Sequence, residues 1–233
     1  IEQGSPQRRE SELRAGESLV RNWQGKANGR IRTMFGPHAP YTCSPECLIR
    51  VKGLAQRYGV GIHTHIAETR WEVEEIKKRY GLSPVEHLEA IGFLGPEVLA
   101  AHSIHLAPHG ISIYRKHGVK PVHNPVSNMK LGCGVAPVPD MLKAGIPVAL
   151  GTDGAASNNT LDMFNEMKFA ALLNKLHRSD PTALPAQQVL EMATINGAIA
   201  LGLQREIGSL EVGKKADVIV LDFKKPHLAP LHN

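Results

Sequence analysis

A group of ionisable side chains follows a short apolar run in the first third of the chain. Val60-Gly61-Ile62 leads into His63-Thr64-His65-Ile66-Ala67-Glu68, so two imidazoles and a carboxylate would lie at the end of one strand. Neutral imidazole is a common ligand of zinc or iron, and a carboxylate three residues further on could exchange protons with a group that the metal activates. A His-x-His pair also occurs in packed strands and on surfaces, so it indicates a site only if other reactive residues gather around it.

Other predicted strands also end in ionisable residues. Apolar segments of strand length are followed by helical patterns several times along the chain, which predicts an α/β fold with a parallel sheet and helical crossovers. In barrels of this kind the catalytic groups collect where the strands end. Five strand ends therefore predict one active site. Their ionisable residues are His38, His63, His65, Glu68, His102, His123 and Asp153.

The elements that would position these residues follow from apolar periodicity and from start signals such as Ser44-Pro45-Glu46, which combines a cap residue, a proline and an early acid. We expect strands at 30–35, 59–65, 98–102, 120–123 and 147–151. We expect helices at 10–23, from 44 onward, and at 68–80, 84–91, 108–116, 139–144, 161–176 and 185–203. The tail, 207–222, reads as two short strands around the turn Gly213-Lys214-Lys215 and would begin a second, smaller β element.

Composition excludes several classes of protein. With 42% hydrophobic and 21% charged residues among 233, the chain has an ordinary globular composition, and its apolar runs are shorter than the roughly 18 residues of a membrane span. Its start lacks the pattern of an export signal, so we expect a cytoplasmic protein. Three cysteines, Cys43, Cys47 and Cys133, fit reduced thiols. The net charge of +5 comes from dispersed pairs such as Lys77-Lys78, which favours solvated faces over a nucleic-acid site.

Four segments of the chain resemble the amidohydrolase family, and within it the aminohydrolase branch of 5-methylthioadenosine/S-adenosylhomocysteine deaminases, guanine deaminases and triazine hydrolases. The resemblance implies a (β/α)8 TIM barrel, of which this chain would hold strands four to eight in residues 1–205. Residues 206–233 would begin a small β-sandwich. The matching segments are Gly36-Pro37-His38-Ala39-Pro40-Tyr41-Thr42, His63-Thr64-His65-Ile66-Ala67-Glu68-Thr69, Asn124-Pro125-Val126-Ser127-Asn128-Met129-Lys130-Leu131 and Gly151-Thr152-Asp153-Gly154.

The resemblance also implies a site for one divalent metal, with zinc expected ahead of iron or manganese. Its ligands in the family are three histidines and one aspartate, of which this chain would supply His65 and Asp153. His63 would then be a packing residue or would lie behind the ligands. Strands one to three of the family barrel have no counterpart here, so we expect a fragment of a protein about twice as long. Half a ligand set should bind metal weakly.

The family chemistry assigns further roles by resemblance. Asp153 would bind the metal and accept a proton from the water that attacks an electrophilic ring carbon, and Glu68 would protonate the neighbouring ring nitrogen. Glu68 and Asp153 would both contact the substrate. His102 would orient the attacking hydroxide in preference to His105, and His38 would contact the ribose or a nearby polar group. Each has a structural alternative: packing for His102, a loop cap for His38, and a turn for Asp153.

These assignments favour a hydrolytic deaminase that acts on a small purine nucleoside, methylthioadenosine or S-adenosylhomocysteine, and releases ammonia. A guanine deaminase or a triazine hydrolase would use nearly the same residues, so pocket shape would have to distinguish them. An inactive fragment or metal-free scaffold is the other alternative, because an open half-barrel exposes sheet edges and apolar faces. We expect no nucleic-acid or membrane partner, and a homo-oligomer is compatible with the sequence.

Overall fold

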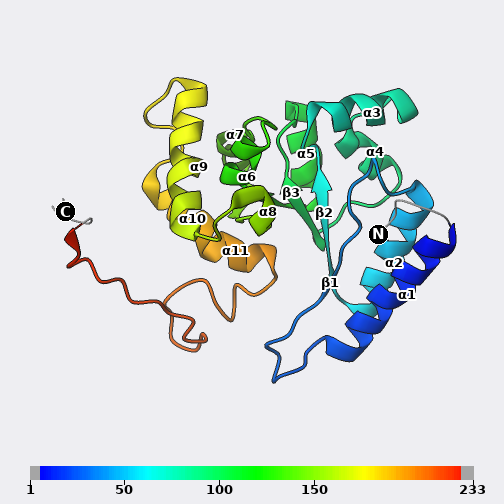
Figure 1. Cartoon of the computed structure of the whole chain (residues 1–233), viewed down its shortest axis with the longest axis horizontal. Coiled ribbons are helices and arrows are strands. Elements are labelled where there is room, and N and C mark those ends of the chain that lie inside the picture. Colours follow the sequence, from blue (N-terminus) through cyan, green and yellow to red (C-terminus); the bar gives the residue numbers. More distant parts are fainter. Residues whose placement is uncertain (1–5, 227–233) are drawn as a thin grey trace.

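A five-stranded parallel sheet forms the centre of the molecule, in the order β1-β2-β3-β4-β5 (Figure 1). The computed structural model describes residues 6–226. The strands are β1 (Met34–Phe35), β2 (Gly61–Ile66), β3 (Val98–His102), β4 (Lys120–His123) and β5 (Ala149–Leu150). The helices are α1 (Pro6–Trp23), α2 (Pro45–Tyr58), α3 (Arg70–Tyr80), α4 (Pro84–Ala90), α5 (Pro108–His117), α6 (Pro125–Lys130), α7 (Val138–Lys143), α8 (Ala155–Asn158), α9 (Met163–Arg178), α10 (Ala186–Ala193) and α11 (Ile195–Ala200).

The parallel register brings the carboxyl ends of the strands to one edge of the sheet. Ile66 at the end of β2 lies opposite His102 at the end of β3, and His123 of β4 lies opposite Leu150 of β5. All four pairings between neighbouring strands are parallel, as the alternation of strands and helices predicts. The ionisable residues at the strand ends are therefore collected at one end of the fold.

Alternation along β2 separates a core face from a site face. Ile62, Thr64 and Ile66 are buried beneath the helices, whereas His63 and His65 project from the other face of the strand. Helix α2 packs on β1 and β2, and α9 and α10 pack on β5. On the site face, α11 covers the end away from His65, where Ala200 joins a small apolar cluster with Leu99 and Ala149.

Helix starts and stops follow local chemistry. At the start of α2, Ser44 accepts a hydrogen bond from the Cys47 amide, as its cap position predicts. Helix α2 is capped at its other end by Gly59, whose φ of 62° is left-handed. Ser83 and Glu86 complete a reciprocal capping box at the start of α4. Thr69 caps α3, which begins at Arg70, two residues after the expected start at Glu68, and ends at Tyr80 as predicted.

Some predicted elements are wrong in length or number. The helix expected over 185–203 is two helices, because Thr194 adopts φ −125° and ψ −94° between α10 and α11. Helix α1 begins at Pro6, four residues before its predicted start. Helices α6 and α8, of six and four residues, were not predicted because they are too short to show a helical apolar period.

Strand β1 is shorter than the expected strand 30–35. The Ile31 amide donates to the Lys26 carbonyl, and the Ile31 carbonyl accepts from the Gly25 amide. The polar backbone groups of Ile31 are thus used in a local loop and are unavailable to β2. Only Met34 and Phe35 pair with β2, opposite Gly61 and Ile62.

The two strands expected between Ile207 and Asp222 are absent. This segment is coil and turn in the structure, and its apolar side chains from Leu210 onward are exposed, with Val220 at 95%. Figure 1 shows it extending away from the helices, and an extended segment without a neighbouring strand cannot form a ladder. Just before this segment, Glu206 forms salt bridges with Arg32 and Lys215. The division of the chain at residue 206 remains a prediction.

The described sheet is open, with β1 and β5 at its two edges. This arrangement is a partial barrel of the expected α/β class.

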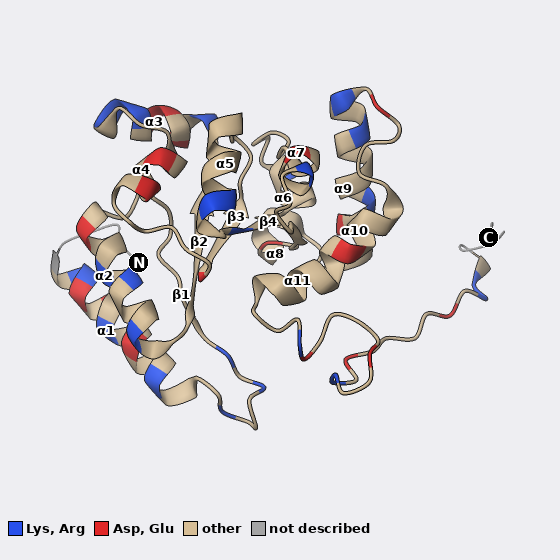
Figure 2. Ribbon diagram, turned by 180° about the vertical axis from the view of Figure 1, so that it is seen from behind, with Lys and Arg blue, Asp and Glu red and all other residues tan. Residues whose placement is uncertain are grey.

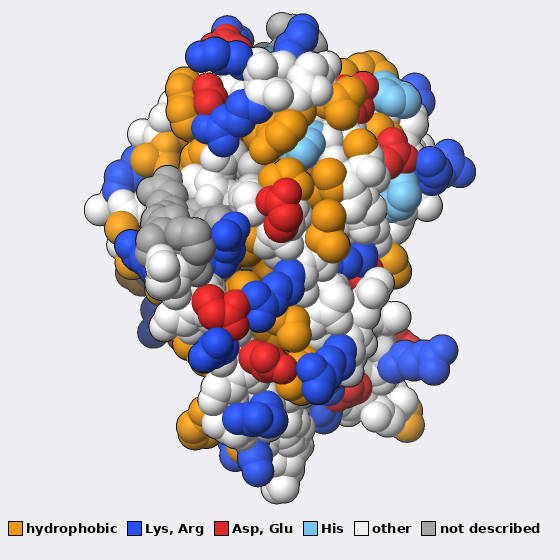
Figure 3. Space-filling model, turned by 90° about the vertical axis from the view of Figure 1, so that its right-hand side faces the viewer, with side chains coloured by type: hydrophobic (Ala, Val, Ile, Leu, Met, Phe, Trp, Pro, Cys, Tyr) orange, Lys and Arg blue, Asp and Glu red, His pale blue; other side chains and the backbone are white. Residues whose placement is uncertain are grey.

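Positive and negative side chains are interspersed on the surface. Lys and Arg alternate with Asp and Glu along helices such as α1 (Figure 2), and both signs of charge occur on the face shown in Figure 3. Among the described residues, no helix is long and apolar enough to cross a bilayer.

Candidate active site

His65 is held at the end of β2 by the loop that follows β1. Its ring Nδ1 lies 2.6 Å from the His38 carbonyl oxygen. A carbonyl only accepts hydrogen bonds, so Nδ1 carries the proton and Nε2 keeps its lone pair. The His65 amide donates to the same oxygen at 3.0 Å, and the Thr64 hydroxyl does so at 3.2 Å. His65 therefore has the protonation and restraint of a metal-ligating histidine.

His102 is buried next to His65, with the two rings stacked at a centroid distance of 5.3 Å. Its Nδ1 lies 2.8 Å from the Asn128 amide oxygen, which accepts, so the unprotonated nitrogen is Nε2. His102 Nε2 lies 3.8 Å from Glu68 Oε1. The φ of His102 is +70°, a conformation that costs a non-glycine residue free energy and is often found at functional sites.

Asp153 follows β5 with φ +61°. Ser127 donates to its Oδ2 at 2.6 Å, and the Gly154 amide donates to its Oδ1 at 2.7 Å. Burial raises the pKa of Asp153, but the Ser127 hydroxyl, the Gly154 amide and the nearby histidines outweigh it, so the pKa lies below its usual value. The carboxylate is therefore fixed and ionised, as a ligand must be.

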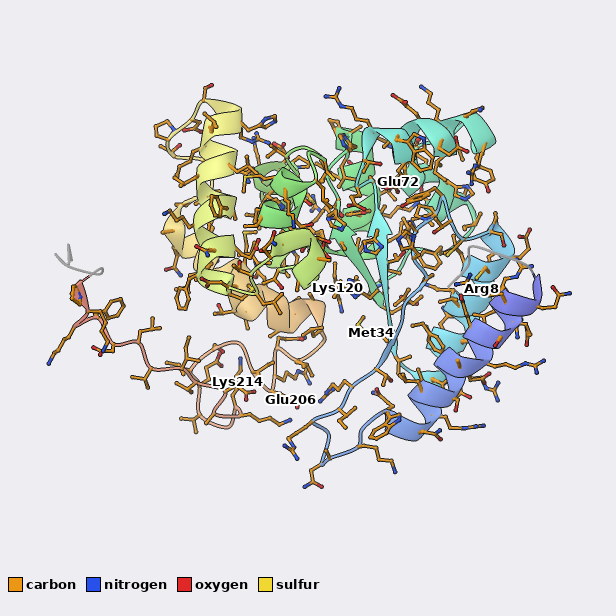
Figure 4. All side chains as sticks on the ribbon, viewed as in Figure 1. Arg8, Met34, Glu72, Lys120, Glu206 and Lys214 are labelled. Carbon is orange, nitrogen blue, oxygen red and sulfur yellow. The ribbon has the colours of Figure 1, made fainter. Side chains whose placement is uncertain are left out.

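Glu68 is positioned through a second glutamate, Glu72, which sequence reasoning missed. The amides of Ala67 and Glu68 donate to the two carboxylate oxygens of Glu72, each at 2.8 Å. Glu72 is fully buried, and burial raises its pKa to about 7. Figure 4 shows Glu72, in the first turn of α3, at the opposite end of the sheet from Met34. The spacing of Thr69 and Glu72 is the capping pattern at a helix start, which could have revealed it.

One short segment, residues 127–133, contacts three of the predicted site residues. Ser127 binds Asp153, Asn128 binds His102, and the Cys133 thiol lies 3.8 Å from Glu68 Oε1. Behind it, Glu166 of α9 accepts from the Val126 amide at 3.3 Å and from the Asn158 side chain at 2.6 Å. Residues 127–133 thus act as a scaffold that contacts the candidate site residues.

His38 is exposed beside His65, with a ring-centroid distance of 4.9 Å. Its Nδ1 lies 2.8 Å from the Thr42 hydroxyl, and Tyr41 meets its ring edge-on at 5.7 Å. Partial burial and the neighbouring His65 lower the pKa of His38. Its carbonyl restrains His65, as described above, while its ring is open to the site. The predicted contact with ribose remains a prediction.

A cavity of about 280 Å³ lies on the site face of the sheet. Its lining includes His63, His65 and Asp153 at the carboxyl ends of the strands and Ala200 of α11 at the other end. His63 is exposed at this cavity, and its role as a packing residue or as a residue behind the ligands remains a prediction. A larger cavity, about 970 Å³, lies near the amino ends of the strands and is lined by none of the predicted site residues.

The amidohydrolase family profile matches residues 2–233. The chain belongs to the amidohydrolase family. It is 57% identical over 230 residues to the 5'-deoxyadenosine deaminase of Methanosarcina acetivorans, and 56% identical over 218 residues to the 5-methylthioadenosine/S-adenosylhomocysteine deaminase of Moorella thermoacetica. These alignments cover 99% and 94% of this chain, but 53% and 51% of the relatives. This amidohydrolase chain thus spans about half the length of the curated relatives that it matches.

A solved amidohydrolase has the same arrangement. An adenosine deaminase from Xanthomonas campestris, crystallised with bound zinc, superposes with a TM-score of 0.90 at 39% identity. The superposition covers 95% of this chain and 50% of that one. The prediction of a partial barrel of amidohydrolase type is therefore confirmed.

The metal-ligand prediction fits this amidohydrolase in part. His65 offers an unprotonated Nε2 and Asp153 an ionised carboxylate, and both line the same cavity. Nitrogen and carboxylate donors suit zinc. Within the described residues, no group of three or more His, Cys, Asp and Glu side chains is arranged to hold a metal ion. Both residues can therefore contribute donor atoms to a divalent-metal site, and zinc as its metal remains a prediction.

His123 makes the stability of the chain depend on pH. It is 1% exposed, its ring nitrogens lack hydrogen-bond partners within the described residues, and burial lowers its pKa from 6.5 to about 3. Between these values the unfolded chain binds a proton that the folded chain does not, so acid destabilises the fold by up to about 1.4 kcal/mol per pH unit. The variant His123→Gln lacks this titration.

We expect the free energy of unfolding of the unsubstituted chain, measured with urea, to fall relative to that of His123→Gln as the pH falls from 6.5 toward 3. Above pH 6.5 the difference in unfolding free energy should be constant. A difference that stays the same over the whole pH range would contradict the buried neutral imidazole.

Proposed function

We propose that this chain supplies the proton-transfer residues and half of the metal ligands of a hydrolytic deaminase for adenosine nucleosides altered at the 5' carbon. The observation that carries the proposal is the approach of His102 Nε2 to Glu68 Oε1 at 3.8 Å, beside the restrained His65. Hydrolysis of a ring C–N bond requires a proton donor near the group that orients the attacking oxygen, and the proposal gives these two roles to Glu68 and His102. The names of the two curated relatives support the substrate class.

In this proposal His65 and Asp153 would hold one zinc ion, with further ligands from outside these two residues. The bound zinc in the related adenosine deaminase supports that choice of metal. Zinc would supply water that is activated near neutral pH. The restraint of His65 by the His38 carbonyl, and of Asp153 by Ser127, would keep both ligands in place before the metal arrives.

The proposal assigns a role in proton transfer or orientation to each of three side chains. Asp153 accepts the proton of the attacking water, and its two restraining donors hold the carboxylate ionised until then. Glu68 gives a proton to the ring nitrogen next to the attacked carbon. His102, with Nε2 unprotonated, accepts a hydrogen bond from the incoming oxygen and orients it. When the C–N bond breaks, the amino group leaves as ammonia with the proton that Asp153 took from the water, and the proton of the added hydroxyl returns to Glu68, so both carboxyl groups regain their starting states.

A substrate panel tests the proposal. This chain would replace the matching 230 residues of the Methanosarcina acetivorans relative, which supplies the remaining length of the enzyme. We expect this chimera to deaminate 5'-deoxyadenosine, methylthioadenosine or S-adenosylhomocysteine, with release of ammonia. Turnover of guanine or a triazine alone would contradict the nucleoside proposal. The relative without replacement is the positive control.

The amount of bound zinc should differ between the isolated chain and the chimera. The chain of 233 residues brings two of the expected ligands, so we expect it to lose zinc during dialysis, whereas the chimera keeps about one zinc per molecule. Mass spectrometry of the metal content measures both. Tight zinc binding by the chain alone that persists in His65→Ala would contradict the ligand assignment.

Cytoplasmic location and homo-oligomer formation remain predictions. Cell fractionation would test the first, and a measurement of size in solution would test the second.

A further inference from the structure

The Cys133 thiol lies next to the proposed proton donor. Its Sγ is 3.8 Å from Glu68 Oε1, and the residue is only 9% exposed. The sequence indicated no role for this cysteine beyond a reduced thiol. The other two cysteines, Cys43 and Cys47, are buried at the start of α2. Cys133 is thus distinguished from them by its position in the site.

The backbone around Cys133 is fixed on both sides. Its amide donates to the Asn128 carbonyl at 2.9 Å, and its carbonyl oxygen lies 2.9 Å from His105 Nε2, which donates to it. Gly132 and Gly134 flank it with φ values of +67° and +122°, conformations that residues with side chains rarely adopt. A Cβ on Gly134 would lie 3.1 Å from Ile104 Cγ2. This turn therefore holds the thiol in a fixed position relative to Glu68.

The thiol keeps its proton at neutral pH. Burial and the adjacent Glu68 carboxylate raise the pKa of Cys133 to about 11. A protonated thiol donates a weak hydrogen bond to a carboxylate oxygen, whereas a thiolate would repel it. His102 Nε2 approaches the same Oε1 atom. The thiol thus restrains Oε1, because an unprotonated His102 Nε2 has no proton to donate to it, and Oε2 is left to face the substrate.

We propose that Cys133 is a positioning residue for Glu68, with its thiol donating to Oε1 so that Oε2 is presented to the ring nitrogen of the substrate. This inference rests on the proposed function for the role of Glu68, but the contact itself does not depend on activity. One measurement therefore tests the contact, and a second tests its consequence for catalysis.

Infrared spectroscopy of the full chain tests the contact. The S–H stretching band of Cys133 is the one that disappears in Cys133→Ala. Because hydrogen bonding weakens the S–H bond, we expect this band to move to higher frequency in Glu68→Ala, and to move less in Glu68→Gln, whose amide oxygen can still accept the bond. A Cys133 band at the same frequency in Glu68→Ala and in the unsubstituted chain would overturn the proposal, whatever reaction the enzyme catalyses.

Kinetics of the chimera test the consequence. A weak hydrogen bond is worth about a two- to fivefold change in rate, so we expect Cys133→Ala to lower kcat by that factor and to leave KM unchanged. Cys47→Ala, which removes a buried thiol remote from Glu68, should leave kcat unchanged. A shared loss of kcat in both variants, or a rise in KM alone for Cys133→Ala, would overturn the positioning role. Inactivity of the unsubstituted chimera on every nucleoside would instead refute the proposed function.

Discussion

We expect Glu68→Gln in the chimera to lower kcat for 5'-deoxyadenosine by about a thousandfold while its zinc content stays the same. A positioned acid typically contributes a factor of about 10² to 10⁴, and glutamine cannot release a proton to the ring nitrogen. The amide of residue 68 would still donate to Glu72, because that bond uses the backbone. The fold and the loop should therefore remain, and stopped-flow or steady-state assays would report the loss of proton transfer alone.

Glu74→Gln is the matched control, because Glu74 is an exposed residue of α3, six positions along the chain. Its kcat should equal that of the unsubstituted chimera. If Glu68→Gln retained most of its activity, or lost activity only together with zinc, then Glu68 would not be the proton donor.

The second large effect should come from Asp153→Asn. We expect zinc content and kcat to fall together, with kcat lower by about a thousandfold, because the amide is a poorer ligand and cannot accept the proton of the attacking water. Ser127→Ala removes a single hydrogen bond to Oδ2 and leaves the carboxylate, so its loss of kcat should be smaller, about tenfold. Metal analysis and kinetics on the same preparations measure both.

Asp222→Asn is the control for Asp153→Asn, since Asp222 is exposed in the C-terminal segment and hydrogen-bonds only with neighbours such as the Lys224 amide within the described residues. It should change neither zinc content nor kcat. Full zinc occupancy in Asp153→Asn would show that this carboxylate is not a metal ligand and would limit it to proton transfer.

The sequence predicts the sheet well where both the strand and its partners lie in apolar runs with clear ends. Strands β3 and β4 have the predicted bounds, and both ends of β2 lie within two residues of theirs. Strand prediction fails where the backbone groups bond within a local loop, or where no neighbouring strand is present to pair with. Ile31 bonds to its own loop instead of to β2, and the segment after Ile207 has alternating apolar residues but no neighbouring strand in the described chain.

The site residues were predictable to the extent that residue type and position after a strand define them. His65, Glu68, His102 and Asp153 all lie where parallel strands end. The groups that hold them were not predictable in the same way. Glu72 acts through its contacts with the Ala67 and Glu68 amides, and a local sequence pattern gives only its place in a cap. Asn128 and Cys133 lie far along the chain from the residues that they contact.

Hydrolysis in water enriched in heavy oxygen tests the central claim most directly. The chimera would be given 5'-deoxyadenosine, and ammonia and the nucleoside product would be measured by mass spectrometry. The account predicts one ammonia for each nucleoside consumed and one heavy oxygen on the purine ring of the product. Loss of the purine base without ammonia, or a nucleoside product without the heavy oxygen, would contradict hydrolytic deamination at this site.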